Sequence, residues 1–373
     1  MHSKYMPQLD GLRFFAVAGV MIGHWLTYSA MTEVGPMLAS CGVNLFFVLS
    51  GFLITQILIE SKLTADRSHG FVLRQFYIRR FLRIFPLYYL VLVLGWMARV
   101  PANGTNFAWF FTYTTNIVIA LKQGDCGYFS HLWSLAVEEQ FYIIFPLVVL
   151  LVPYKKLPYA FVTMIVLGPV SRGVLFLLFR NNPLQPWLTY VSTPCCFDAF
   201  GIGAMLAYQK TTDAALLKKR LRKFMPFLGV LIGIIGLYFY STHRPRLWLP
   251  ISAFYRLGFC VFFFWVIGVA SLNAFKGAAK RILENKVIIY LGKISYGIYV
   301  YHHFMPYIFE KAGVDQRIHS IAAKAALYFV GTVCISALSW HLFEKPINGL
   351  KKYFNYTPAE KPTEISYSYG SSK

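Results

Sequence analysis

Two side chains in otherwise apolar stretches are suited to proton transfer, and the first is His24. It follows Arg13 by eleven residues in the first apolar stretch, which on a helix separates the two by about 16 Å along the axis. With Arg13 at the inner membrane surface, His24 would lie beyond the midplane, toward the outside. Imidazole is the commonest general base near neutral pH, so we interpret His24 as a catalytic candidate. The alternatives are a histidine bonded to a backbone carbonyl and an arginine that only anchors the helix.

The second candidate is Glu138, in the sequence HLWSLAVEEQFY that begins at His131 and opens a later apolar stretch. On a helix, Ser134 and Glu138 are four residues apart and share a face, whereas Glu139 points about 100° away. A carboxylate inside a membrane is costly and usually functional. The pattern predicts that Glu138 assists the chemistry; neutralisation of both acids by an arginine of another stretch is the alternative.

Arg80 and Arg83 form a third candidate site, at the start of another apolar stretch. Residues three apart share one face of a helix, and a guanidinium group binds phosphate through two parallel hydrogen bonds. The spacing therefore predicts a phosphate site that faces the cytosol. The alternative is that both arginines only mark the cytoplasmic side of the membrane.

The sequence lacks the common motifs of nucleotide-binding and metal-binding sites. The sequence contains no Walker loop, no H-E-x-x-H motif and no C-x-x-C pair, so we predict no metal site. His302 and His303 are adjacent in sequence and would face different ways on a helix. We interpret them as structural residues.

The elements that must hold these residues are membrane helices. The chain has 373 residues, of which 57% are hydrophobic and only 14% are charged, and its mean hydropathy is +0.51. A soluble protein carries about 25% charged residues, so the composition excludes a soluble domain, a disordered chain and a disulfide-stapled miniprotein. The net charge of +21 requires no nucleic acid as a partner, because cytoplasmic loops of membrane proteins collect Lys and Arg.

We expect an all-α polytopic membrane protein, a bundle of about ten transmembrane helices with both termini cytoplasmic. The stretch 106–121 is apolar but contains several Asn and Thr residues, and we predict that it packs on the outer side instead of spanning. The inward loops then hold 24 Lys and Arg residues and the outward loops 7, in line with the positive-inside rule. The predicted spans are 10–28, 44–60, 81–98, 133–152, 158–179, 194–209, 224–241, 251–272, 287–309 and 318–343.

Two further features concern the loops and the C-terminus. Cys41 and Cys126 fall on predicted outer loops, where an oxidising compartment permits a disulfide and where two free thiols are the alternative. The chain from about Thr357 is rich in Pro, Ser and Tyr. We expect that end of the chain to be disordered.

Several segments together resemble the integral-membrane acyltransferase 3 family, and they extend over nearly the whole chain. The resemblance implies a bundle of about ten helices that transfers acyl groups, commonly acetyl from cytosolic acetyl-CoA, to sugars outside the membrane or to other acceptors. The segments that carry it are Leu9–Arg13 with His24, Gly42–Ile54, Arg79–Pro86, His131–Tyr142 and Ile294–Tyr299.

The resemblance also implies residue roles. His24 and Glu138 would be catalytic, and Arg13, Arg80 and Arg83 would bind the phosphates of the acyl donor. Many relatives carry Asp where this sequence has Asn at position 44, which weakens a catalytic role there. The residues expected to support the substrate site are Asp10, Asn44, Ser134, Glu139 and Tyr142.

We therefore predict a multi-pass O-acyltransferase of the inner (plasma) membrane. Residues 1–345 would form the membrane acyltransferase domain and residues 346–373 a cytoplasmic tail that is partly disordered. Acetyl-CoA would be the acyl donor, and an envelope polysaccharide or lipid-linked glycan the acceptor. The alternatives are a proton-coupled transporter in which His24 and Glu138 relay protons, and a structural membrane subunit.

The predicted sidedness can be tested by cysteine labelling of intact cells, in a background with the native cysteines replaced. Loop 209–223 holds six Lys and Arg residues and loop 26–43 holds none, so the positive-inside rule places them on opposite sides. We expect Ala215→Cys to resist an impermeant thiol reagent until the cells are permeabilised, and Ser29→Cys to react at once. The reverse labelling pattern would contradict the ten-span arrangement.

Overall fold

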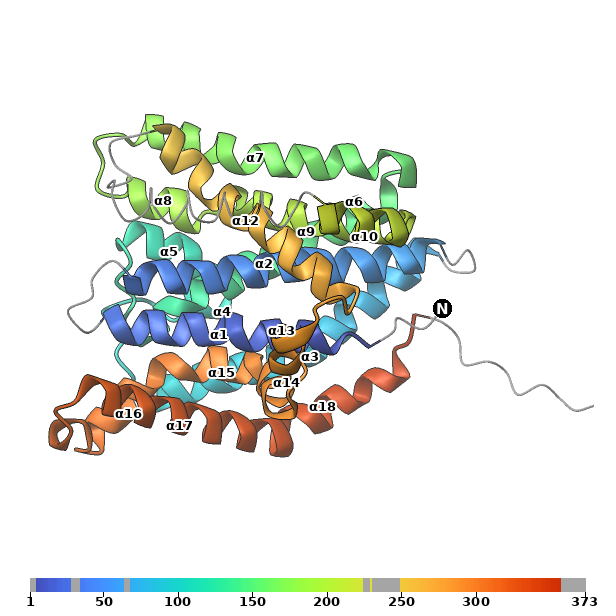
Figure 1. The fold of residues 1–373 in the computed structure, drawn as a ribbon. Helices are drawn as coiled ribbons and strands as arrows, with labels where there is room; N and C mark the ends of the chain where they lie inside the picture. Colours follow the sequence, from blue (N-terminus) through green and yellow to red (C-terminus); the bar gives the residue numbers. More distant parts are fainter. Residues whose placement is uncertain (1–4, 28–33, 64–67, 224–228, 230–248, 357–373) are drawn as a thin grey trace, which may run out of the picture.

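The described part of the chain is helical. The computed structural model describes residues 5–27, 34–63, 68–223, 229 and 249–356, and these residues contain no β-strand. The long helices run side by side in one bundle, with shorter helices at both ends (Figure 1). The expectation of an all-α fold is confirmed for this part of the chain.

Three helices form the centre of the bundle, and the middle one packs against both others. In Figure 1 the two blue helices of the three lie between the green helices, which include the third, and the red helices at the other side of the bundle. The three are α1 (Pro7–Thr27), α2 (Val34–Leu63) and α9 (Phe197–Thr212).

Glycines allow α2 to approach its two neighbours closely. A Cβ atom at Gly42 of α2 would lie 2.3 Å from the carbonyl oxygen of Ala16 in α1, and a Cβ atom at Gly203 of α9 would lie 2.1 Å from that of Val48 in α2. Membrane helices commonly pack through such small residues, because little hydrophobic force acts between helices in lipid. The positions of α1, α2 and α9 relative to one another therefore depend on these glycines.

Within the described residues, five helices are long and apolar enough to cross a membrane, and a sixth span results if a pair bent by 58° is counted as one. Large apolar side chains on several of them point outward, as lipid contact requires. The five are Gly35–Leu63 in α2, His69–Met97 (α3), Gly127–Leu151 (η1, Gly127–Leu132, and α6, Trp133–Leu151), Tyr154–Leu178 (η2, Tyr154–Lys156, and α7, Leu157–Leu178) and Ile321–Tyr353; the bent pair is Gln185–Val191 (α8) with Thr193–Thr212 (η3, Thr193–Cys196, and α9).

The expected count of ten spans is thus supported only in part. The stretch 224–241 lies outside the described residues apart from position 229. The stretch 287–309 is not one continuous helix, contrary to the expectation. It is divided into α14 (Lys286–Lys293), α15 (Ser295–Tyr301), η5 (His302–Phe304) and α16 (Met305–Lys311).

A proline accounts for the interruption of the helix at η5. Pro306 has no N–H to donate to the carbonyl of His302, and its ring disfavours a continuous helix there. The carbonyl of His302 accepts the backbone N–H of Met305 in the 3-10 turn and also a hydrogen bond from the indole nitrogen of Trp25 in α1, at 3.4 Å. The break thereby joins the start of η5 to the end of α1.

The apolar stretch 106–121 does not form a spanning helix, as expected. It contains two short helices, α4 (Ala108–Phe111) and α5 (Thr115–Leu121). The amide of Gln140 in α6 donates to the carbonyl of Tyr113 at 2.8 Å and to the side chain of Asn116 at 3.0 Å. These bonds fix the stretch against α6.

The helix at the C-terminus continues past the predicted boundary at residue 345. Its parts pack against α3, where the Arg79 guanidinium donates to the carbonyls of Lys351 at 2.8 Å and Phe354 at 3.1 Å. Residues 357–373 lie outside the described residues. The parts are α17 (Ile321–Ser339), a π-helical turn (η7, Trp340–Glu344), α18 (Lys345–Gly349) and η8 (Leu350–Tyr353).

The cysteines and the remaining helices complete the fold. Cys41 and Cys126 are both free thiols, and Cys41 lies within α2 and not on a loop. The remaining helices are α10 (Ala214–Lys223), α12 (Leu249–Ser271), α13 (Gly277–Leu283) and η6 (Asp315–Arg317).

The close contact of α9 with α2 can be tested by thermal unfolding of the purified protein. Gly203→Ala should lower the unfolding temperature, because the added methyl group meets backbone that cannot move aside, and such overpacking costs about 1–3 kcal/mol. The matched control is Gly70→Ala in α3, where an added Cβ has no neighbour within 4 Å. Equal unfolding temperatures for the two variants would contradict the observed packing.

Candidate active site

Two cavities lie within the bundle, and among the described residues they share no lining residue. We name them by their side chains. The arginine cavity has a volume of about 300 Å³ and is lined by Arg13, Arg79, Arg80, Arg83 and Lys351 among others. The histidine cavity has a volume of about 1040 Å³ and is lined by His24, His131 and His303 among others.

Cations outnumber acids in the lining of the arginine cavity, with five Lys and Arg side chains and two Glu side chains. Arg80 and Arg83 form no hydrogen bond or ion pair with any other residue that the structure describes, while the Arg80 guanidinium lies 4.9 Å from the centre of the Tyr142 ring. Because a guanidinium has five donors and no acceptor, two of them facing one cavity leave many donors for a ligand. This arrangement suits an anionic group such as a phosphate.

Arg13 reaches the same cavity from α1 and is held by Asp10. The two side chains form an ion pair at 2.7 Å, and Tyr5 donates a hydrogen bond to the second oxygen of Asp10 at 2.9 Å. Burial and the Asp10 carboxylate raise the pKa of Tyr5 to about 12, so its hydroxyl remains a donor at neutral pH. Asp10 therefore orients Arg13 and does not face the cavity itself.

Two further cations, Arg79 and Lys351, line this cavity and were not predicted. Arg79 precedes Arg80 directly, so spacing alone assigned it to another helix face. Lys351 lies beyond the predicted domain boundary, and only the packing of η8 on α3 brings it to the site. The adjacent pair Lys351 and Lys352 is the sequence signal that could have pointed to it.

The opposite wall of the arginine cavity carries the two predicted acids. Glu138 accepts hydrogen bonds from the hydroxyls of Ser50 and Tyr142. Glu139 is buried, and one of its oxygens has no hydrogen-bond partner among the described residues. Both line the cavity together with Ser134, so the motif SLAVEEQFY supplies one wall of the predicted phosphate site.

The wall between the two cavities is built from the start of α6 and the end of α15. His131 faces the histidine cavity, while Ser134, one helical turn later, faces the arginine cavity. The hydroxyl of Ser134 is bonded to that of Tyr299, which donates to the carbonyl of His131 at 2.8 Å. These hydrogen bonds join the two segments that form the partition, the start of α6 and the end of α15.

Four histidines gather on the far side of this partition; we call His24, His131, His302 and His303 the histidine cluster. The Nδ1 atom of His24 lies 2.8 Å from the Nε2 atom of His302. The ring of His303 has its centre 5.1 Å from that of His24 and 4.8 Å from that of His131. In the described part of the chain, no group of three His, Cys, Asp or Glu residues is arranged to hold a metal ion.

Aromatic rings form much of the remaining surface of the histidine cavity. They come from η1, from the start of α6 and from α8. Polar side chains such as Asn103 and Gln185 belong to the same lining. The rings are those of Tyr128, Trp133, Trp187 and Tyr190.

The structure brings most of the predicted site residues together, but not all. Arg13, Arg80, Arg83, Ser134, Glu138, Glu139 and Tyr142 line the arginine cavity. His24 lines the other cavity, so Glu138 hydrogen-bonds elsewhere and not to His24.

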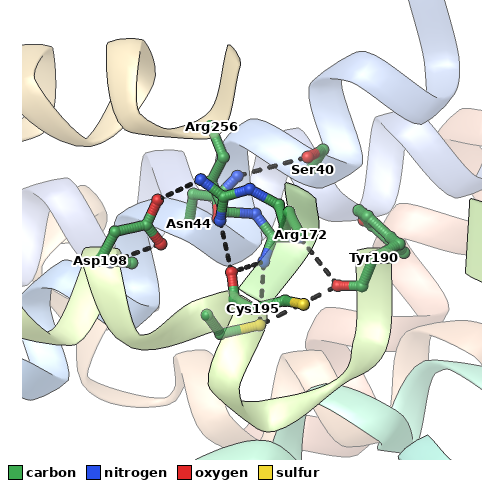
Figure 2. A network of polar contacts seen from close by, with 9 residues as sticks. Ser40, Asn44, Arg172, Tyr190, Cys195, Asp198 and Arg256 are labelled. Atoms are coloured by element: carbon green, nitrogen blue, oxygen red, sulfur yellow. Dashed lines mark hydrogen bonds and ion pairs between the residues drawn. The ribbon is translucent and has the colours of Figure 1, made fainter. Parts of the chain in front are cut away.

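Asn44 lines neither cavity and lies in a buried polar network (Figure 2). Its amide donates to Ser40 at 3.3 Å, and beside it Arg172 forms an ion pair with Asp198 at 2.6 Å. Arg256 donates to the carbonyl of Tyr190 at 2.9 Å. Ser40, Arg172 and Tyr190 of this network also line the histidine cavity. Neither Arg172 nor Arg256 lines the arginine cavity, where Glu138 and Glu139 lie.

Comparison with known proteins gives one consistent result. A family model described as "Acyltransferase domain" matches residues 6–341. A provisionally named O-acetyltransferase of Staphylococcus aureus strain MSSA476 is 29% identical over 394 residues, and O-acetyltransferase OatA of strain NCTC 8325 is 28% identical over 387 residues. The alignments cover 97% and 96% of this chain and 60% of each relative, so the chain spans less than two thirds of the relatives' length. No solved structure matches this one.

Proposed function

This chain belongs to the acyltransferase family, and we propose that it is a membrane O-acyltransferase. It moves an acyl group, most simply acetyl, from acyl-CoA on the cytosolic side to a hydroxyl of an envelope polysaccharide or lipid-linked glycan on the other side. The observation that carries this proposal is the pair of cavities, one cationic and one histidine-lined, on the two faces of a single partition.

The arginine cavity suits the donor. Arg80, Arg83 and Lys351 offer donors to the phosphates of acyl-CoA, and charge-assisted bonds of this kind are stronger than neutral ones. The basic helix α10, with five Lys and Arg residues in ten positions, lies at the same end of the bundle as α18 and the N-terminus (Figure 1). The positive-inside rule assigns that end to the cytosol.

The histidine cavity suits the acceptor. Its aromatic rings offer flat apolar surfaces and its amides offer hydrogen bonds, a combination that matches the apolar faces and hydroxyl edges of a sugar ring. His24 lies on this surface, where an acceptor hydroxyl can reach it.

His24 would act by one of two routes, as a base or as a nucleophile. In direct transfer it takes the hydroxyl proton, the oxygen attacks the thioester carbonyl carbon, the carbon–sulfur bond breaks, and the proton passes to the thiolate. In covalent transfer a nitrogen of His24 attacks the thioester carbonyl carbon and the carbon–sulfur bond breaks, which releases the thiolate. The acceptor oxygen then takes the acyl group from His24, and the hydroxyl proton passes through His24 to the thiolate. Both routes require a free lone pair on His24, and both benefit from a partition that excludes water, because hydrolysis of the thioester competes.

The role of His24 can be tested by mass spectrometry of envelope glycans. A strain lacking the gene should lose an acetyl group from a glycan, and the wild-type gene should restore it. We expect His24→Ala to be expressed and folded but to restore no acetylation, whereas His341→Ala, a histidine that lines neither cavity, should restore it. Full acetylation by His24→Ala would contradict the assignment, and proton-driven transport without acetyl-CoA consumption would favour the transporter.

The donor site can be tested by binding of acetyl-CoA to the purified protein. The variant Arg80→Ala with Arg83→Ala should bind at least 100-fold more weakly, because each lost charge-assisted bond costs about 1.5–3 kcal/mol. Lys351→Ala should weaken binding by about tenfold, and the neighbouring Lys352→Ala, outside the cavity, is the matched control. Unchanged affinity in the double variant would show that the arginines do not bind the donor and only mark the cytoplasmic side of the membrane.

A further inference from the structure

The proton positions in the histidine cluster follow from its hydrogen bonds, beginning with His302. This residue is fully buried, and its Nδ1 atom lies 2.6 Å from the carbonyl oxygen of Tyr299. A carbonyl oxygen has no proton to give, so Nδ1 of His302 must be the donor. A neutral imidazole has one N–H only, which leaves Nε2 of His302 as an acceptor.

The ring of His24 meets this acceptor edge to edge. The two rings are within 6° of parallel, with centres 5.1 Å apart, while the nitrogens are 2.8 Å apart. The distance between the centres is close to the 2.8 Å between the nitrogens plus one ring radius on each side, which is the largest value that this contact allows. The rings therefore lie nearly in one plane, as a short N–H···N hydrogen bond requires.

We propose that His302 is a positioning residue that holds His24 in the tautomer with Nδ1 protonated and Nε2 free. Since Nε2 of His302 can only accept, Nδ1 of His24 must donate, and its proton cannot then occupy Nε2. The hydrogen bond made by one ring nitrogen determines which nitrogen carries the proton. His24 belongs to the cavity lining and His302 does not, so the carbonyl of Tyr299 and the ring of His302 form a fixed line behind the reactive ring.

This inference rests on the proposed acyl transfer and makes it more specific. The free Nε2 is the atom that accepts the hydroxyl proton, or the acyl group in the covalent route. When it gains a proton, the Nδ1–H bond to His302 remains in place and the carbonyl dipole of Tyr299 still polarises His302. The positive charge on His24 is stabilised without any carboxylate, and no carboxylate of the described residues hydrogen-bonds a member of the cluster.

The neighbouring histidines do not share this role. His131 lies 3.1 Å through Nε2 from the carbonyl of Val300, and His303 lies 3.0 Å through Nδ1 from that of Tyr128. Each is thus held by its own backbone partner, and neither hydrogen-bonds His24. His302 alone, among the described residues, makes a side-chain hydrogen bond to the His24 ring.

Two amide substitutions at His302 distinguish loss of its hydrogen bond to His24 from a general loss of structure. In His302→Gln the side-chain amide ends near the former position of Nε2, so its oxygen can still accept from His24. In His302→Asn the amide ends near the former position of Nδ1, so it can bond Tyr299 but cannot reach His24. Both replacements are uncharged amides, and thermal unfolding of each variant reports any general loss of structure.

The first measurement is ¹⁵N NMR of the full chain in nanodiscs with labelled histidine. The chain has nine histidines, and the His24 signals are those lost in His24→Gln. We expect one protonated and one unprotonated nitrogen for His24 in the wild type, with the proton on Nδ1, and an averaged pair in His302→Asn. A wild-type proton on Nε2 would overturn the proposal.

The second measurement is transfer of radiolabelled acetyl from acetyl-CoA to the washed envelope fraction of a strain lacking the gene. His302→Asn should lower kcat by about 10²-fold, the scale of a misplaced catalytic group, with an unchanged KM for acetyl-CoA, and His302→Gln should recover most of the loss. Wild-type kcat in a folded His302→Asn would overturn the proposal. A wild type that transfers no acetyl but shows the expected tautomer would support the His24–His302 bond and overturn the proposed function instead.

Discussion

The organisation of this protein depends on the cost of placing polar groups in an apolar surrounding. Within a membrane, water does not satisfy them, so each needs a partner from the chain or must face a cavity. The pairs Asp10–Arg13 and Arg172–Asp198 are solutions of the first kind. Arg80 and Arg83 are a solution of the second kind, because the arginine cavity is where their donors can be met by a ligand. The same constraint explains why arginines in one case and histidines in the other mark the two cavities.

One short segment of the partition contributes side chains to both cavities. His131 and Ser134 stand one turn apart at the junction of η1 and α6, yet they serve opposite cavities. Tyr299 ties the segment to α15 with its hydroxyl and holds His302 with its carbonyl. A single tyrosine therefore contacts both the wall of the arginine cavity and the histidine cluster.

Local patterns in the sequence predicted the parts of the site that lie on one helix. Arg80 with Arg83 and Ser134 with Glu138 share faces because of helical spacing, and each pair lines the same cavity. What sequence could not predict depends on contacts between distant segments. His302 meets His24 across 278 positions through the packing of η5 against α1, and Lys351 reaches the arginine cavity through the packing of η8 on α3, where Arg79 bonds its carbonyl. The all-α fold followed from composition, whereas the broken stretch 287–309 did not.

The hydrogen-bonded wall formed by Ser134, Tyr299 and His131 also bears on membrane permeability. An enzyme that links a cytosolic donor to an external acceptor risks becoming a pore, and a pore would dissipate the ion gradients on which the cell depends. Here the two cavities remain separate chambers, and the groups between them are already engaged with one another. A chain of water through this wall would first have to break these hydrogen bonds, so the wall opposes electrical conduction between the two cavities.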